Sequence, residues 1–292
     1  MVINSGIYQL RLTSKKIMGK FKKDTLIQNF ILLIFLLLVG CDKSNKNKDK
    51  LSLDLKPEVS KSNTAISLVG LNDFEHFILG YNYYLKDDYM KAINAFNKAI
   101  ELNANEFEYY LNRGIVKEST GDFKGAIADY DKSISINKND SDTYFLRGNL
   151  KQSLYDFKGA LKDYSEAINI NPSFGLYHYN YGNVNYKLFN FEEAERAYEN
   201  AISLNRNDTD SIINLGSTKY QLKDIKGAIR NYKKALRSNK NNSIIYYNLA
   251  KIEYKSLNKK GFCNYLKKSS DLGYERAIID LNKFCTSRQK KE

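Results

Sequence analysis

The sequence has no tryptophan, only two prolines and two histidines, and three cysteines among its 292 residues. Because proline breaks helices, its scarcity favours long, uninterrupted helices. The two histidines, His76 and His178, occupy one column of the repeat described below, where other units carry tyrosine, so we interpret both as packing residues. The sequence also lacks a phosphate-binding loop, a nucleophile motif and a cluster of metal ligands. We therefore expect no enzyme activity, no cofactor and no metal.

A glycine returns five times at an interval of 34 residues, and Ala250 occupies the next place. A glycine inside a helix costs about 1 kcal/mol relative to alanine, so its repetition indicates two helices that approach too closely for a side chain. Repetition at a fixed period is typical of a helical repeat array. The column consists of Gly80, Gly114, Gly148, Gly182 and Gly216.

Three further columns keep the same interval, and their spacings of four and three residues place them on one face of a helix. We expect this face to be small, aromatic and small, with the ring filling the gap between repeats. The first column is Ala92, Ala126, Ala160, Ala194 and Ala228, the second is Phe96, Tyr130, Tyr164, Tyr198 and Tyr232, and the third is Ala99, Ser133, Ala167, Ala201 and Ala235.

A polar column precedes the alanine column by four residues and predicts where the second helix of each unit begins. Aspartate and asparagine are preferred helix N-caps because their side-chain oxygens accept hydrogen bonds from unpaired N–H groups. The column is Asp88, Asp122, Asp156, Asn190, Asp224 and Asn258. For the first helices we expect Ser141, Thr209 and Ser243 to act as caps. Each unit is thus helix, short turn and helix, and the chain is all-α.

These columns resemble the tetratricopeptide repeat family, whose pattern has Leu-Gly, Ala, an aromatic residue and Ala at these offsets. The resemblance covers six units over 73–274 and implies a right-handed solenoid of helical hairpins, closed by a capping helix over 275–287 before a tail at 288–292. The sixth unit departs from the pattern, with Phe262, Leu266 and Ser269 in place of Ala, aromatic and Ala. The units start at Asp73, Phe107, Ser141, Gly175, Thr209 and Ser243.

Residues 1–40 have the pattern of an export signal, with Met18 as an alternative start. A lysine-rich stretch precedes an apolar run of ten residues, Phe30–Val39, which is too short to span a bilayer as a helix. The run ends in Leu38-Val39-Gly40-Cys41, which resembles a bacterial lipobox and implies lipid attachment at Cys41. An uncleaved signal anchor or a chance cysteine is the alternative. We expect a polar, disordered tether over 41–72 and an anchor in a membrane of the bacterial cell envelope, inner or outer.

The net charge of +13 is spread over the chain without a basic stripe on the expected binding face, so we expect no nucleic-acid partner. Cys263 and Cys285 flank a helix–loop–helix whose loop centres near Gly273. Antiparallel helices place the two cysteines at similar heights, and an oxidising envelope favours a disulfide between them. Two buried free thiols are the alternative.

In the family, the first helices line a concave face through repeat positions 2, 5, 9 and 12. The resemblance therefore implies a groove rich in tyrosine, a side chain suited to recognition. Alternatively, several of these rings pack between neighbouring first helices. Asparagines recur at positions 6 and 9 and are candidates for holding a peptide backbone: Asn112, Asn180, Asn214, Asn248, Asn149 and Asn183. The groove candidates are Phe77, Tyr81, Tyr84, Phe145, Tyr179, Tyr186, Tyr220, Tyr247 and Tyr254.

The repeat resemblance and the expected anchor predict a non-catalytic, membrane-anchored adaptor. It would bind a protein or peptide in the groove and assist the assembly of envelope complexes. The alternative is a lipoprotein that binds peptidoglycan or surface glycans, which the lack of tryptophan disfavours. A homo-oligomer built through the array stays open.

Overall fold

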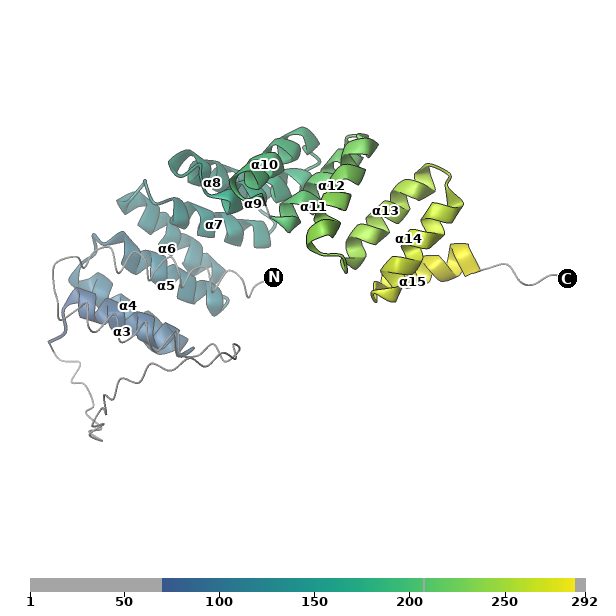
Figure 1. Cartoon of the computed structure of the whole chain (residues 1–292). Helices are drawn as coiled ribbons and strands as arrows, with labels where there is room; N and C mark the ends of the chain where they lie inside the picture. Colours follow the sequence, from purple (N-terminus) through teal and green to yellow (C-terminus); the bar gives the residue numbers. More distant parts are fainter. Residues whose placement is uncertain (1–69, 207, 287–292) are drawn as a thin grey trace, which may run out of the picture. The chain divides into compact units, whose positions relative to one another are not determined.

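The computed structural model describes residues 70–206 and 208–286, and this part of the chain is helical with no strand (Figure 1). The helices are α3 (Asp73–Tyr84), α4 (Tyr89–Leu102), α5 (Phe107–Ser119), α6 (Phe123–Ile136), α7 (Ser141–Ser153), α8 (Phe157–Ile170), α9 (Gly175–Lys187), α10 (Phe191–Leu204), α11 (Thr209–Gln221), α12 (Ile225–Ser238), α13 (Ser243–Lys255), α14 (Lys259–Asp271) and α15 (Glu275–Leu281), followed by the π-helical turn η1 (Asn282–Thr286). The predicted signal peptide (1–40), the lipid site Cys41, the tether up to residue 69 and the tail (288–292) lie outside the described residues.

The helices pack as hairpins in chain order. Each odd-numbered helix from α3 to α13, here called an A helix, packs on the even-numbered B helix that follows it, and each B helix packs on the next A helix. The prediction of an all-α array of helical hairpins is confirmed. Because contacts join neighbours, each repeat buries its apolar face only against the repeats beside it. No helix within the described residues is long and apolar enough to cross a membrane.

The glycine column provides the close approach between the two helices of each of the first five hairpins. A Cβ built on Gly182 would lie 2.9 Å from Cε1 of Tyr198, and one on Gly80 would lie 2.8 Å from the ring of Phe96. The five rings of the aromatic column, from Phe96 to Tyr232, are buried. Each ring therefore packs on the glycine of its own repeat. Tyr130, Tyr198 and Tyr232 also share apolar clusters with residues of the next repeat, in agreement with the expectation that the ring fills the gap between repeats. The ring joins the A helix to the B helix, and the missing Cβ makes room for it.

The predicted caps of the B helices are N-caps in all six hairpins of the described residues, and five of them accept a bond from the backbone three residues on. Asn190 is the exception: its side-chain oxygen accepts no cap bond, and its side-chain nitrogen donates to Oδ1 of Asn185. The predicted caps of the A helices are wrong by one residue. Asp140, Asp208 and Asn242 are the capping residues, because a carboxylate or amide oxygen one residue earlier reaches the N–H at the third helical position.

The turn inside each hairpin holds one residue with positive φ directly before the N-cap of the B helix. Gly121 fills this place in the second repeat, at φ 85°, and the other five hairpins use residues with a Cβ. Leu257 has φ 57° and is 91% exposed. Left-handed backbone disfavours residues with a Cβ, so the turn geometry is imposed by the packing of the two helices. The non-glycine residues at this place are Asp87, Tyr155, Phe189, Lys223 and Leu257.

Two buried carboxylates tie the hairpins of the second and third repeats. Asp163 is fully buried between Arg147, whose Nη2 lies 2.6 Å from Oδ1, and Lys151, whose Nζ lies 2.9 Å from Oδ2. Asp129 is held in the same way by an arginine and a lysine of its own repeat. A buried carboxylate is tolerated when it is paired and hydrogen-bonded. The sequence signal is an arginine in place of the family's leucine, with an aspartate 16 residues later.

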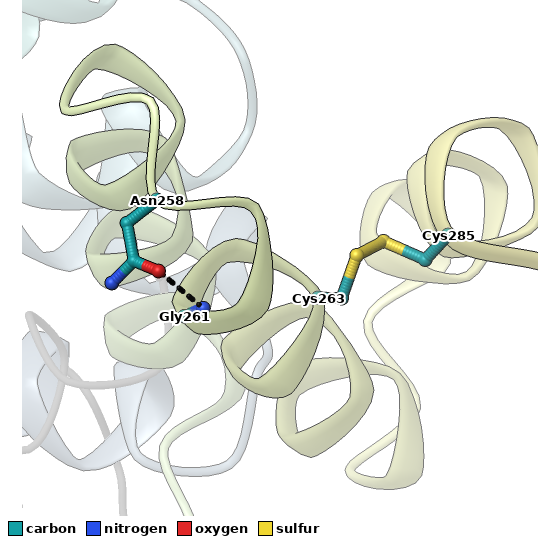
Figure 2. Close-up of a disulfide and its surroundings, with 4 residues drawn as sticks. All are labelled: Asn258, Gly261, Cys263 and Cys285. Carbon is teal, nitrogen blue, oxygen red and sulfur yellow. Dashed lines mark hydrogen bonds between the residues drawn. A yellow bond between two sulfur atoms is a disulfide. The ribbon is translucent and has the colours of Figure 1, made fainter.

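The last hairpin is covered by α15, whose Ala277 joins the apolar cluster of Ala250, Phe262 and Leu266. The predicted single capping helix over 275–287 is instead α15 followed by η1. Cys263 on α14 and Cys285 on η1 are bonded, with their Cα atoms 5.7 Å apart (Figure 2). Figure 2 also shows the cap of α14, where Oδ1 of Asn258 accepts from the N–H of Gly261 at 3.1 Å.

Candidate functional site

Three of the predicted groove residues are core residues. Phe77 is 4% exposed and packs against Phe96 and Tyr109 of two helices beside it, with ring centroids 5.8 and 5.1 Å away. Phe145, two repeats later, is 3% exposed and packs in the same way against Tyr164 and Tyr177. Tyr81 is also buried, and burial raises the pKa of its hydroxyl to about 12. A large apolar ring at these places fills the space between hairpins, so the prediction that these three side chains line an open groove is wrong.

Four of the six asparagines at repeat positions 6 and 9 join neighbouring repeats. Oδ1 of Asn149 accepts hydrogen bonds from Asn180 of the next repeat, at 2.9 Å, and from the hydroxyl of Tyr164, at 2.8 Å. The same arrangement recurs one repeat later around Asn183. Asn112 donates to the carbonyl of Glu108 within its own helix. The amides of Asn149, Asn180, Asn183 and Asn214 satisfy buried hydroxyls and each other, so these four do not form the predicted row for a peptide backbone.

Six predicted groove side chains stay accessible. Five of them, Tyr179, Tyr186, Tyr220, Tyr247 and Tyr254, lie on the consecutive A helices α9, α11 and α13 and are called the tyrosine row below. Tyr84 is half-buried on α3, away from this row. Within the row, exposure ranges from half-buried rings to Tyr254, which is 59% exposed. Rings with one accessible face and a hydroxyl are suited to binding another chain.

The row is held in place by side chains behind it. The ring of Tyr179 lies 6.2 Å from that of buried Tyr198, and Tyr186 packs on Phe191 at 5.4 Å. Burial raises the pKa of the Tyr179 hydroxyl, so this group stays protonated near neutral pH and is a hydrogen-bond donor. A preorganised aromatic side chain loses little entropy when a partner binds.

The row ends in a hollow of about 310 Å³ between α13, α14 and the capping segment, which consists of α15 and η1. This hollow is called the C-terminal pocket below. Its walls combine three residues of the row with two phenylalanines, two lysines, an alanine and an aspartate. The lining residues are Tyr220, Tyr247, Ala250, Lys251, Tyr254, Lys255, Phe262, Asp280 and Phe284.

The charges of this pocket are unequal. Its one carboxylate, Asp280, accepts a 2.8 Å hydrogen bond from the hydroxyl of Tyr247. Lys255 Nζ lies 4.8 Å from the ring centre of Tyr220, and Lys251 Nζ lies 5.7 Å from that of Tyr247. Neither lysine has an ion-pair partner within the described residues. The pocket is therefore aromatic and carries an excess of positive charge.

Burial and the neighbouring charges of Lys255 and Arg276 lower the pKa of Lys251. Burial and the bond to Asp280 raise the pKa of the Tyr247 hydroxyl. The pKa of Lys251 falls as expected for a cation without a nearby counter-charge, and the pKa of Tyr247 rises as expected for a hydroxyl that donates to a carboxylate. An added anion would stabilise the charged form of Lys251.

Tyr220, Tyr247 and Tyr254 of this pocket were predicted from the sequence as groove residues, and the other lining residues were not. Lys251 occupies repeat position 9 of the sixth unit, one of the positions that the family resemblance assigns to the binding face, so the signal was present. Phe284 and Asp280 come from the capping segment, whose approach to α13 no repeat pattern encodes.

A second hollow of about 310 Å³ lies between α10, α11 and α12. It is lined by side chains of both charge signs, including Glu199, Arg206 and Lys234, and contains no aromatic ring. Mixed charge without an aromatic wall gives it no preference for one class of ligand.

The histidines do not form a site. His178 is 9% exposed, and its Nε2 lies 2.9 Å from the carbonyl oxygen of Pro172 in the preceding loop. His76 lies on α3, far away in the array. The described residues contain no group of three His, Cys, Asp or Glu side chains placed to hold a metal ion.

Family models of the tetratricopeptide repeat match residues 79–141, 141–174 and 175–208, and a further model described as a TPR repeat matches 216–256. Together the matches span more than half of the chain. A comparison with curated proteins finds no significant match.

Solved structures of tetratricopeptide repeat proteins are similar in fold. YrrB, described as a TPR protein with an unusual peptide-binding site, is 23% identical with a TM-score of 0.59, covering 66% of this chain and 100% of that one. PilF of Pseudomonas aeruginosa is 15% identical with a TM-score of 0.59, covering 74% and 97%. MamA from Desulfovibrio magneticus is 17% identical with a TM-score of 0.54, covering 57% and 95%. At these identities the likeness concerns the fold alone.

Proposed function

Since the chain belongs to the tetratricopeptide repeat family, we propose that it is a non-catalytic scaffold that binds a protein or peptide along the tyrosine row. The observation that carries the proposal is the row itself. Five tyrosines on three consecutive A helices keep accessible faces, while the equivalent rings Phe77 and Phe145 are buried in the first and third repeats. Accessible aromatic side chains on rigid helices are the usual anchors of protein interfaces.

The proposal includes a lipid anchor at Cys41 and a place in the bacterial cell envelope, where the scaffold assists the assembly of a protein complex. Its support is the sequence Leu38-Val39-Gly40-Cys41 after a short apolar run. Two or more acyl chains give stable attachment, whereas one gives only marginal binding. Replacing Cys41 with alanine is expected to release the protein from the membrane fraction or leave it unprocessed. Unchanged mass and unchanged membrane attachment of Cys41→Ala would refute the anchor.

The neighbours support the protein-binding part only by analogy of fold. The description of YrrB names a peptide-binding site in that protein. A shared solenoid does not transfer a ligand, because function depends on the side chains displayed on the fold. What this chain binds therefore depends on its own tyrosines.

The test is crosslinking in cells followed by pull-down of the full chain and identification by mass spectrometry. The test variant combines Tyr179→Ala, Tyr186→Ala and Tyr220→Ala, and normal helicity is checked by circular dichroism. Tyr155→Ala is the matched control, because Tyr155 is 79% exposed on a turn outside the row. A protein recovered with the wild type and the control but lost with the triple variant supports the proposal. Equal recovery from all three places binding elsewhere, and recovery of glycan without protein favours a glycan-binding lipoprotein.

A further inference from the structure

The C-terminal pocket combines depth, aromatic walls and charge at one end of the tyrosine row. Tyr220, Tyr247, Tyr254, Phe262 and Phe284 surround one hollow. Three of these rings form a cluster, with Tyr254 5.1 Å from Phe262 and 6.3 Å from Phe284. A volume of about 310 Å³ lies at the lower end for ligand sites, which suits one large side chain rather than an extended segment.

The two lysines of the pocket stand beside rings and without carboxylate partners among the described residues. A cation over a tyrosine ring is stabilised weakly by comparison with a charge-assisted hydrogen bond to a carboxylate. Asp280 forms no ion pair with either lysine among the described residues, and its Oδ2 accepts a hydrogen bond from Tyr247. An entering carboxylate would therefore gain two donors, Lys251 and Lys255, at the edge of an aromatic hollow.

The apolar wall and the cations together select one kind of group. We propose that the C-terminal pocket anchors the partner by taking up an aromatic or large aliphatic side chain whose neighbouring residue is a carboxylate paired with Lys251 and Lys255. This inference rests on the proposed function and adds the chemistry of the bound segment: an acidic peptide with an apolar residue beside the acid.

The disulfide positions the wall of this pocket. Phe262 directly precedes Cys263 on α14, and Phe284 directly precedes Cys285 on η1. The bond therefore holds the two phenylalanine rings, whose centroids are 6.1 Å apart, on the same side of the hollow. The short capping segment brings Phe284 and Asp280 to the site, and without the bond its last turn is attached only through its own packing.

The test uses fluorescence polarisation with the full chain and end-capped, dye-labelled hexapeptides of glycine and serine. The first probe contains one phenylalanine followed by one aspartate, the second has asparagine instead of the aspartate, and the third has alanine instead of the phenylalanine. We expect the first probe to bind at least about tenfold more tightly than either of the others, since it alone uses both the apolar wall and the cations.

Two variants give the matched comparison. The double variant Lys251→Gln with Lys255→Gln is expected to lose the preference for aspartate over asparagine while still binding the phenylalanine. Lys226→Gln, at an exposed lysine on α12, is the control and is expected to keep the preference for aspartate over asparagine. Equal binding of the aspartate and asparagine probes to the wild type, or a preference that survives in the double variant, would overturn the inference. Reduction of the disulfide is expected to weaken the binding of the first probe several-fold, while the circular dichroism of the array stays unchanged.

The outcomes separate this inference from the proposed function. If the cellular partner is lost with the triple tyrosine variant but the probes show no preference for the acid, the scaffold stands and the pocket has no selectivity for an acidic segment. If the preference for the acid is found but no cellular protein depends on the row, the pocket stands and the scaffold proposal fails.

Discussion

Nδ2 of Asn214 donates a hydrogen bond to Oδ1 of Asn183 in the preceding repeat, at 2.9 Å. The same oxygen accepts from the hydroxyl of Tyr198, at 2.8 Å, and Tyr198 is 1% exposed. One side-chain oxygen thus satisfies a buried hydroxyl of its own repeat and an amide of the next. A bond of this kind stabilises both the hairpin and its junction with the following hairpin.

Replacing Asn183 with alanine is expected to lower the free energy of unfolding by about 1–3 kcal/mol, because a buried hydroxyl and an amide lose their acceptor. Denaturation with urea measures the change. In the double variant Asn183→Ala with Tyr198→Phe, which removes the orphaned hydroxyl as well, part of the loss is expected to return. Additive losses would show that the hydroxyl and the amide do not interact.

Replacing Gly182 with alanine is expected to cost about 1–3 kcal/mol by overpacking, since the new Cβ would lie 2.9 Å from the buried ring of Tyr198. Gly175→Ala, in the first turn of the same helix, is the control. The nearest atom to its added Cβ is 3.4 Å away, so we expect a neutral or slightly stabilising effect from the better helix propensity. A stable Gly182→Ala protein would mean that the hairpin can open without loss.

The left-handed turn residue gives a reciprocal pair of substitutions. Leu257→Gly is expected to raise the free energy of unfolding by about 1 kcal/mol, because φ is 57° and the leucine side chain is almost fully exposed. Gly121→Leu, at the equivalent place in the second repeat, is expected to lower it by a similar amount. Thermal unfolding of both variants tests the pair. The same sign for both would refute the account.

The carboxyl group of Glu118 is expected to make the free energy of unfolding depend on pH. Burial raises the pKa of its carboxyl, although the hydroxyl of Tyr130 donates to it at 2.8 Å and acts in the opposite direction. Between the unfolded and folded pKa values the native state holds the extra proton, so stability falls as pH rises through that window. Glu118→Gln is therefore expected to stabilise the protein at pH 7 and to stabilise it less at pH 4. Urea titrations at the two pH values measure this, and an equal effect of Glu118→Gln at both pH values would contradict it.

Local structure followed from the sequence wherever one residue type repeats at one phase. The N-caps of the B helices and the glycine column were predicted because each depends on contacts within about four residues or on one ring of the same repeat. The caps of the A helices were misplaced by one residue, since aspartate at 140 and serine at 141 are both good caps and only the backbone decides between them.

The candidate site was predicted less well than the fold. Phe77 and Phe145 occupy the same repeat position as Tyr179 and Tyr247, yet the first two are buried and the others keep an accessible face. Position in the repeat gives the direction of a side chain, whereas its exposure depends on the neighbouring helix. Phe284 of the pocket comes from a capping segment outside the repeat, so no column could have indicated it.

The junctions between repeats differ in their tolerance of a change in length. Excising the fourth unit (175–208) would bring Asn149 opposite Asn214, and the amide pair would be rebuilt from identical chemistry. Excising the third unit (141–174) would place Ile115 opposite Asn180, leaving an amide against an apolar side chain. Whole-unit duplication or deletion is thus easier after the third repeat than before it.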